Sequence, residues 1–113
     1  MENGCDWKGR IIKPVITDSA VYVPFAFETL TIDNTSGGIA LTLGTYEGAS
    51  YAKISVETAP IRFRTDGGAP TVSLGHLLSI DDIAELESPN EIANFLAIRT
   101  ENTSAILMVT YFK

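Results

Sequence analysis

The strongest constraint on the fold is an alternation of apolar and polar residues with a period of two. The runs "FETLTID", "IALTLG", "AKISVE" and "IRFRT" each place apolar residues at every second position. Successive side chains of an extended strand point to opposite faces, so each run predicts a strand with one buried face. The runs "FLAIRT" and "AILMVTYF" are also strand-like, but both of their faces are apolar. Threonine, valine, isoleucine and aromatic residues dominate all six runs, as is typical of half-buried strands.

Turn residues separate these runs at short intervals. The segments "DNTSGG" (33–38), "TDGGAP" (65–70) and "ENTS" (101–104) each lie between predicted strands. Short strands with turns at such spacing favour an antiparallel β-sandwich or a barrel. We therefore expect an all-β fold with about seven to nine strands.

Two segments depart from this pattern. "SPNEIANF" combines Ser88 as a helix N-cap, Pro89 at the first helical position and Glu91 three residues after the cap. These signals predict one or two turns of helix, and we expect at most a short helix near residues 89–94. "SIDDIAELES" fits either helical or strand spacing, and we favour a strand.

The length of 113 residues and the composition predict one globular domain, residues 11–113, after an N-terminal arm, residues 1–10. The arm is polar and contains the only tryptophan, Trp7. The alternation assigns the following residues to the core: Leu30, Ile32, Leu41, Leu43, Ile54, Val56, Ile61, Phe63, Phe95, Ala97, Leu107 and Val109.

Charge and composition argue against several classes of function. A net charge of −6 with scattered basic residues disfavours nucleic-acid binding, and the longest apolar runs are too short to cross a membrane. The single cysteine, Cys5, excludes an internal disulfide and a cysteine-pair metal site. The start of the chain lacks the apolar core of a signal peptide, so we expect a protein made in a cytoplasm.

The sequence also offers little for catalysis. The single histidine, His76, is best explained as a turn residue, and the acids of 81–87 as a solvated surface. "DNTSGG" places threonine and glycine where a calcium loop needs oxygen ligands, so we interpret it as a turn. We expect no catalytic site, metal or cofactor.

Arg62 and Arg64 raise a sharper question. They alternate with Ile61 and Phe63, so they lie on the face opposite the core. One interpretation is a solvated strand whose arginines pair with acids on neighbouring strands. The other is an intermolecular interface, to which Trp7 would add an anchor in a neighbour's pocket.

The stretches "APIRFRTDGGAPTVSLGHLL" and "EIANFLAIRTENTSAILMVTYFK" carry a family resemblance. They resemble the C-terminal part of small virion proteins of tailed bacteriophages, which pair an Ile/Val-Arg-Phe/Tyr-Arg strand with an Asp-Gly turn and a Gly-His. These proteins end on an Arg strand followed by a Thr-Tyr-Phe close. The resemblance covers roughly residues 57–113, and the earlier residues match only as generic β-sequence.

The resemblance implies a compact β-sandwich, jelly-roll-like, that has a structural role in the virion. The expected function is a capsid decoration (cement) protein on the head surface, which binds the major capsid protein and itself as a homo-oligomer, with a trimer among the options. It implies no nucleic-acid or membrane partner. The alternative is a lectin-like or fibre-associated ligand-binding module of the same fold, for which Tyr46 and Tyr51 would be the aromatic platform.

Overall fold

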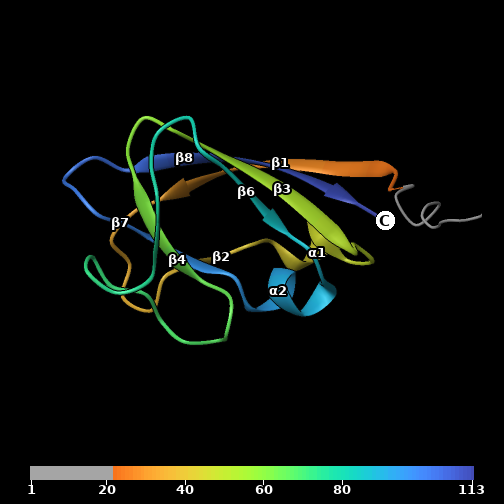
Figure 1. The fold of residues 1–113 in the computed structure, drawn as a ribbon, viewed down its shortest axis with the longest axis horizontal. Helices are drawn as coiled ribbons and strands as arrows, with labels where there is room; N and C mark the ends of the chain where they lie inside the picture. Colours follow the sequence, from red (N-terminus) through yellow and green to blue (C-terminus); the bar gives the residue numbers. More distant parts are fainter. Residues whose placement is uncertain (1–21) are drawn as a thin grey trace, which may run out of the picture.

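Eight strands pair into two four-stranded antiparallel sheets in the computed structural model, which describes residues 22–113 (Figure 1). The first sheet has the order β1-β8-β3-β6 and contains β1 (Pro24–Ile32), β8 (Ala105–Phe112), β3 (Tyr51–Glu57) and β6 (Ile83–Leu86). The second has the order β2-β7-β4-β5 and contains β2 (Ile39–Ala40), β7 (Leu96–Arg99), β4 (Ile61–Arg64) and β5 (His76–Leu78). The all-β antiparallel sandwich that the sequence predicts is confirmed.

The strand order is that of a jelly roll. The first strand pairs with the last, β2 pairs with β7, β3 with β6 and β4 with β5, all antiparallel. Strands β5 to β8 therefore pair with β4 to β1 in reverse order. The pairs β1–β8 and β3–β6 belong to the first sheet, and the pairs β2–β7 and β4–β5 belong to the second. This nested pairing is the double Greek key of jelly-roll domains.

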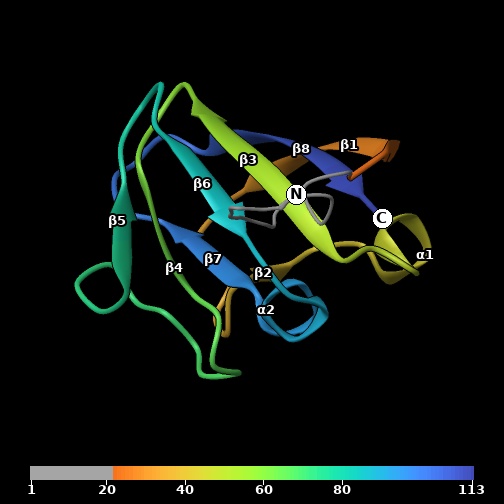
Figure 2. The same ribbon diagram turned by 45° about the vertical axis from the view of Figure 1, so that its right-hand side comes forward.

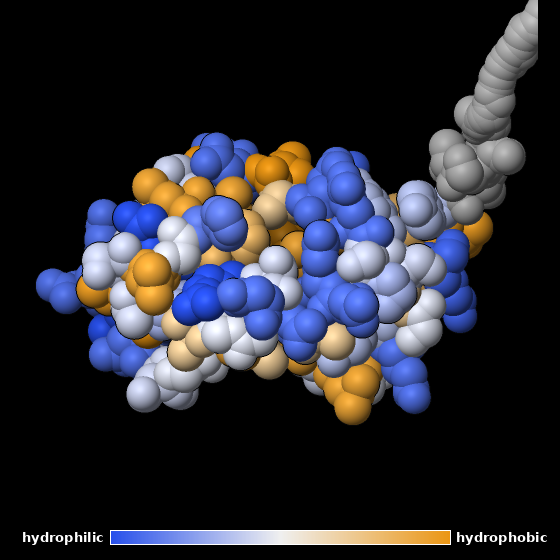
Figure 3. Space-filling model, turned by 60° about the horizontal axis from the view of Figure 1, so that its bottom comes forward, coloured by the Kyte–Doolittle hydropathy of each residue, from blue (hydrophilic) through white to orange (hydrophobic). Residues whose placement is uncertain are grey.

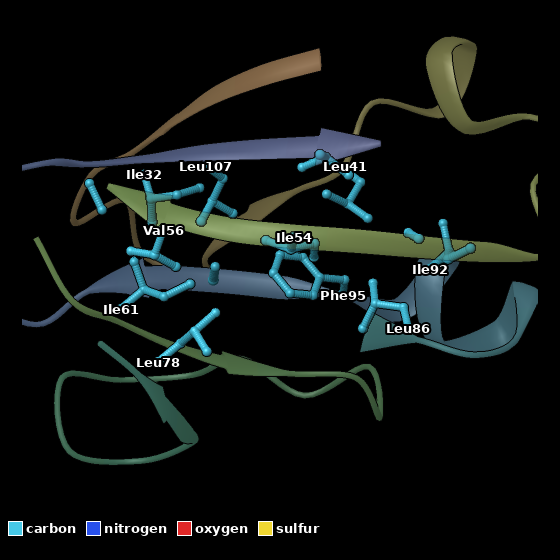
Figure 4. Close-up of a cluster of buried hydrophobic side chains, with 14 of the residues drawn as sticks. Ile32, Leu41, Ile54, Val56, Ile61, Leu78, Leu86, Ile92, Phe95 and Leu107 are labelled. Carbon is cyan, nitrogen blue, oxygen red and sulfur yellow. The ribbon is translucent and has the colours of Figure 1, made fainter. Parts of the chain in front are cut away.

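The core lies between the inner faces of the two sheets (Figure 4). Alternation predicts these faces correctly along most strands, because a residue and its partner in register point to the same side. The predicted core residues that are fully buried are Ile32, Leu41, Ile54, Val56, Ile61, Phe95, Ala97, Leu107 and Val109. Of the two apolar faces of "AILMVTYF", the buried one also contributes Ala105 and Tyr111.

Three of the core predictions need correction. Leu30 and Phe63 are only partly buried and pack against the edge of the core. Leu43 is 63% exposed, so its assignment to the core is wrong. The strand that the alternation of "IALTLG" predicts ends at Ala40, and the chain turns into a one-turn helix, α1 (Leu43–Tyr46). The Thr42 backbone N–H donates to the Glu28 carboxylate (3.1 Å), which fixes the start of this turn beside β1.

The helix near residue 89 and the strand in "SIDDIAELES" are both confirmed. Helix α2 (Pro89–Asn94) begins after Ser88, whose hydroxyl accepts the Glu91 N–H at 3.2 Å. The Glu91 carboxylate in turn accepts the Glu87 N–H at 2.8 Å, so the backbone N–H groups of both Glu87 and Glu91 have side-chain acceptors. Ile92 anchors the helix in the core at 1% exposure. Helix α1 adds a second short helix to the one that the sequence predicts.

The N-terminal arm, residues 1–10, with Trp7 and Cys5, lies outside the described residues. Residues 11–21 of the predicted domain lie outside them as well.

Candidate partner interface

Arg62 and Arg64 lie on the outer face of the second sheet, as the alternation of "IRFRT" predicts. Ile61 is fully buried, and its partner in register on β5, Leu78, is only 7% exposed. The face of β4 that contains Ile61 is therefore the one that packs on the core. Arg62 therefore shares the outer face with its partners in register, Leu77 on β5 and Ile98 on β7. Arg64 lies beside Leu96 on the same face.

Both guanidinium groups turn toward the loop of residues 65–75, which joins β4 to β5 and extends beyond the end of the sheet (Figure 2). Arg62 donates from Nε to the carbonyl of Val72 (3.2 Å) and from Nη1 to the carbonyl of Gly75 (2.9 Å). Since Val72 is at the tip of the loop and Gly75 follows it, Arg62 ties the tip and the returning arm of the loop to β4.

Arg64 holds the outgoing arm. Its Nε and Nη2 atoms donate to the two carboxylate oxygens of Asp66 at 3.0 and 2.6 Å, and its Nη1 donates to the carbonyl of Ala69 at 3.4 Å. The bidentate pair has the fork geometry that makes arginine–carboxylate contacts strong and directional. Asp66 also accepts the Gly68 N–H (3.1 Å), and the hydrogen bonds from Arg64 and Gly68 lower the pKa of Asp66 to about 2.

Two glycines make this packing feasible. A Cβ atom on Gly68 would lie 2.4 Å from Nη2 of Arg64, so any side chain there would displace the guanidinium. Gly75 has a φ of +129°, and a Cβ there would lie 3.1 Å from the Phe63 carbonyl oxygen. The "DGGAP" and "LGH" glycines are therefore needed for close approach of the loop to β4.

The tip of the loop is a small hairpin with an apolar surface. Thr71 and Leu74 form an isolated bridge, with backbone hydrogen bonds of 2.9 and 3.2 Å in the two directions. Pro70, at the base of the tip, is buried, and its ring lies close to Gly38, where an added Cβ atom would be 3.2 Å from Pro70 Cδ. Val72 and Leu74 remain 57% and 53% exposed, and Leu77 beside Arg62 is 54% exposed. We name these three residues, Val72 and Leu74 of the loop with Leu77 of the adjoining strand β5, the braced apolar loop.

The two interpretations of the arginines can now be compared with their contacts. Arg64 pairs with an acid, but that acid is in the following turn and not on a neighbouring strand. The described contacts of Arg62 and Arg64 are to their own loop, and whether the arginines also contact a partner stays a prediction. Trp7, the third predicted interface residue, lies outside the described residues.

Sequence reasoning missed the apolar residues of the loop. "TVSLGHLL" lies in a segment rich in glycine and proline, where alternation carries no information about which side chains are exposed. A usable signal was present, since three large aliphatic residues in a turn-rich segment have few ways to reach a core.

The remaining candidate residues have local roles. The His76 ring packs against Phe63, with ring centroids 5.5 Å apart. The Asp33 carboxylate accepts the backbone N–H and the hydroxyl of Thr35, which together lower the pKa of Asp33, so "DNTSGG" is a closed turn. Asp82 accepts the Ser79 N–H in the turn before β6.

Within residues 22–113, no group of three or more histidine, cysteine or acidic side chains is arranged to hold a metal ion. No pocket opens on the surface that these same residues form. None of the helices in the described part of the chain combines the length and the hydrophobicity that a membrane span requires.

Comparisons with protein-family models, with curated proteins and with solved structures find no match to this chain.

Proposed function

We propose that this chain is a structural protein of a tailed-phage virion, a capsid decoration (cement) protein that binds the outer surface of the head and stabilises the shell. Two things support the proposal before any contact is considered. The sequence of residues 57–113 resembles small virion proteins, and the jelly roll is a fold that viral capsid domains use repeatedly. Because fold alone does not decide function, a decoration protein must also have a surface suited to a protein partner.

The observation that carries the proposal is the braced apolar loop. Exposed aliphatic residues on a projecting loop suit burial against another protein, provided that the loop loses little entropy on binding. Arg62 and Arg64 supply that rigidity, since they fix both arms of the loop through four of its acceptor groups. The proposed partner is the major capsid protein, and the proposed contacts are Val72, Leu74 and Leu77, with the arginines as supports beside them.

The overall charge is consistent with an outer position on the head. With a net charge of −6, the protein would be repelled by the packaged genome and would need no basic face. On the face shown in Figure 3, hydrophobic residues form separate patches among polar ones. On this face, a partner would therefore be contacted through small apolar patches and not through one large apolar surface.

The test is attachment to purified phage heads. Wild-type protein is expected to co-sediment with heads at a fixed copy number per capsid protein, measured by quantitative mass spectrometry. Leu74→Asp and the double variant Arg62→Ala/Arg64→Ala should both bind more weakly while the isolated domain stays folded. Leu43→Asp is the matched control, because Leu43 is also an exposed leucine (63%, against 53% for Leu74) but lies on α1. Heads that bind the Leu74→Asp and double variants as tightly as wild type would contradict this interface, and failure of wild type to bind would contradict the function.

A second candidate, the lectin-like or fibre-associated module, is favoured by one observation. The rings of Tyr22 and Tyr51 stack with centroids 5.0 Å apart, and Phe112 packs on Tyr51 at 5.2 Å. Burial and the nearby Glu85 and Glu87 raise the pKa of Tyr51 to about 12. An aromatic platform beside acids is a common carbohydrate-binding arrangement, although here the Tyr46 ring of the sequence prediction packs on Tyr111 instead. Glycan-array binding that is lost in Tyr51→Ala would support this alternative.

A further inference from the structure

The free edges of the first sheet differ from those of the second in length and in exposed apolar surface. Among residues 22–113, β1 pairs only with β8 and β6 only with β3, so both are edge strands of 9 and 4 residues. The second sheet ends in β2 and β5, which have only 2 and 3 residues. Short edges are protected against pairing with other chains, whereas a long edge with few charges is a template for it.

Exposed apolar side chains lie at both edges of the first sheet. Val23, directly before β1, and Phe27, within it, are 56% and 59% exposed, and we call this surface the β1 edge. Ile80 and Ile83 are 48% and 61% exposed at the turn into β6, and we call this surface the β6 edge. The β1 edge has almost no outward charge, because the one ionisable residue of β1, Glu28, turns inward to the Tyr111 hydroxyl.

Charge discriminates between the ways in which these edges could be covered. The β6 edge is acidic, with Asp81, Asp82 and Glu85 beside its two isoleucines. Lys113 lies next to the β1 edge: it pairs with Val23 through two backbone hydrogen bonds of 3.0 Å, and its Nζ atom lies 4.5 Å from the centroid of the Phe25 ring on β1. Two β6 edges would therefore repel each other, whereas a β6 edge and a β1 edge are complementary in charge.

Strand direction allows the same pairing. The first sheet has four strands, and every neighbouring pair is antiparallel, so β1 and β6 run in opposite directions. A rotation about an axis along the strands keeps the direction of β1 unchanged from copy to copy. The β6 edge of one copy then meets the β1 edge of the next in antiparallel orientation, as a continuation of the sheet.

We infer that copies of this chain associate edge to edge, with the β6 edge of one copy against the β1 edge of the next. Such an interface is heterologous, so it cannot form a two-fold dimer; it joins three or more copies into a ring when the rotation between them closes, and into an open filament when it does not. The inference specifies the self-association that the proposed function includes. It is tested on isolated protein, so its outcome is independent of binding to heads.

The first measurement is the mass in solution by light scattering after size-exclusion chromatography. The wild type is expected to have the mass of three or more 12.2-kDa chains. Phe27→Asp and Ile83→Asp should each reduce the mass to that of a monomer, because each damages one side of every junction. Leu74→Asp is the control with an equally exposed aliphatic residue in the loop, and it should keep the oligomer while losing attachment to heads. Circular dichroism checks that all three variants fold.

The second measurement identifies the edges in contact by cross-linking with a short bis-maleimide, in a Cys5→Ser background that removes the only native cysteine. Phe27→Cys and Ile83→Cys proteins should cross-link efficiently when mixed, but neither should cross-link with itself. A monomeric wild type would overturn the inference, as would a dimer or self-cross-linking of Phe27→Cys, since these indicate a two-fold β1–β1 contact. An oligomer that survives both aspartate variants would overturn it too.

Discussion

The Tyr111 hydroxyl, near the end of the last strand, donates a partly buried hydrogen bond to the Glu28 carboxylate on the first strand. The two residues are 83 positions apart in the chain and lie on paired strands, β8 and β1. The same carboxylate accepts the Thr42 N–H at the start of α1. Burial and this hydrogen bond raise the pKa of Tyr111, so the phenol stays neutral and acts as a donor. The Glu28 carboxylate therefore joins three segments: β1 near the start of the described chain, the residue that precedes α1, and β8 at the end.

Tyr111→Phe is expected to lower the free energy of unfolding by about 1 to 3 kcal/mol, because the Glu28 carboxylate loses a buried donor. Urea denaturation followed by circular dichroism measures the change. Tyr46→Phe is the control, since the Tyr46 hydroxyl makes no side-chain hydrogen bond to another described residue and its ring packs on Tyr111. An equal effect of both substitutions would show that the hydrogen bond adds nothing to stability.

The Arg64–Asp66 pair predicts an acid-sensitive loop. The pKa of Asp66 is about 2 in the folded protein, and about 3.9 is expected when the chain is unfolded. Because the folded pKa is depressed, the stabilisation is present above about pH 4 and is lost as the pH falls toward 2. Carboxyl-carbon NMR should find the low pKa directly. Arg64→Lys, which loses the bidentate fork, should move the Asp66 pKa toward its ordinary value, whereas Arg62→Lys should leave it in place.

Phe95 and Phe63 stack with ring centroids 5.4 Å apart, but they should differ in their contributions to stability. Phe95 is completely buried, so Phe95→Ala should cost about 3 to 5 kcal/mol. Phe63 is only partly buried and should cost less, because part of its ring already contacts solvent. The two variants are compared by thermal and urea unfolding, and a larger loss for Phe63→Ala would mean that β4 is packed differently from this structure.

The two leucines Leu107 and Leu43 test the correction to the predicted core. Leu107 is 0% exposed on β8, and Leu107→Ala should cost about 2 to 5 kcal/mol. Leu43 is on the surface of α1, so Leu43→Ala should change stability by no more than about 0.5 kcal/mol. A strongly destabilised Leu43→Ala protein would restore the original assignment of this residue to the core.

The N-cap of α2 provides a local test. Ser88→Ala removes the acceptor for the Glu91 N–H and should cost about 1 kcal/mol, whereas Ser88→Asp should restore most of it. If Ser88→Ala were neutral, the backbone at the start of α2 would have to find another acceptor, which hydrogen exchange at Glu91 would reveal.

Apart from β5, which it did not predict, and β2, which it predicted too long, the sequence alone determined the strands, the buried face of those with clear alternation, and the cap of α2. These properties depend on neighbouring residues, because side chains alternate along any extended backbone and a serine before a proline caps whatever helix follows. For the same reason, the position of Arg62 and Arg64 opposite Ile61 could be predicted with no knowledge of the fold.

Only the tertiary structure decided which strands pair, that Leu43 leaves the core, and what the arginines contact. The jelly-roll order depends on pairings such as β1 with β8, which join segments from opposite ends of the described chain and leave no periodic signal. Alternation predicted the face on which the arginines lie, but it could not predict their hydrogen-bond partners. Those partners are in a loop that folds back on β4, and this return depends on two glycines and a buried proline. Alternation describes one strand at a time, whereas these contacts depend on where a second segment comes to lie.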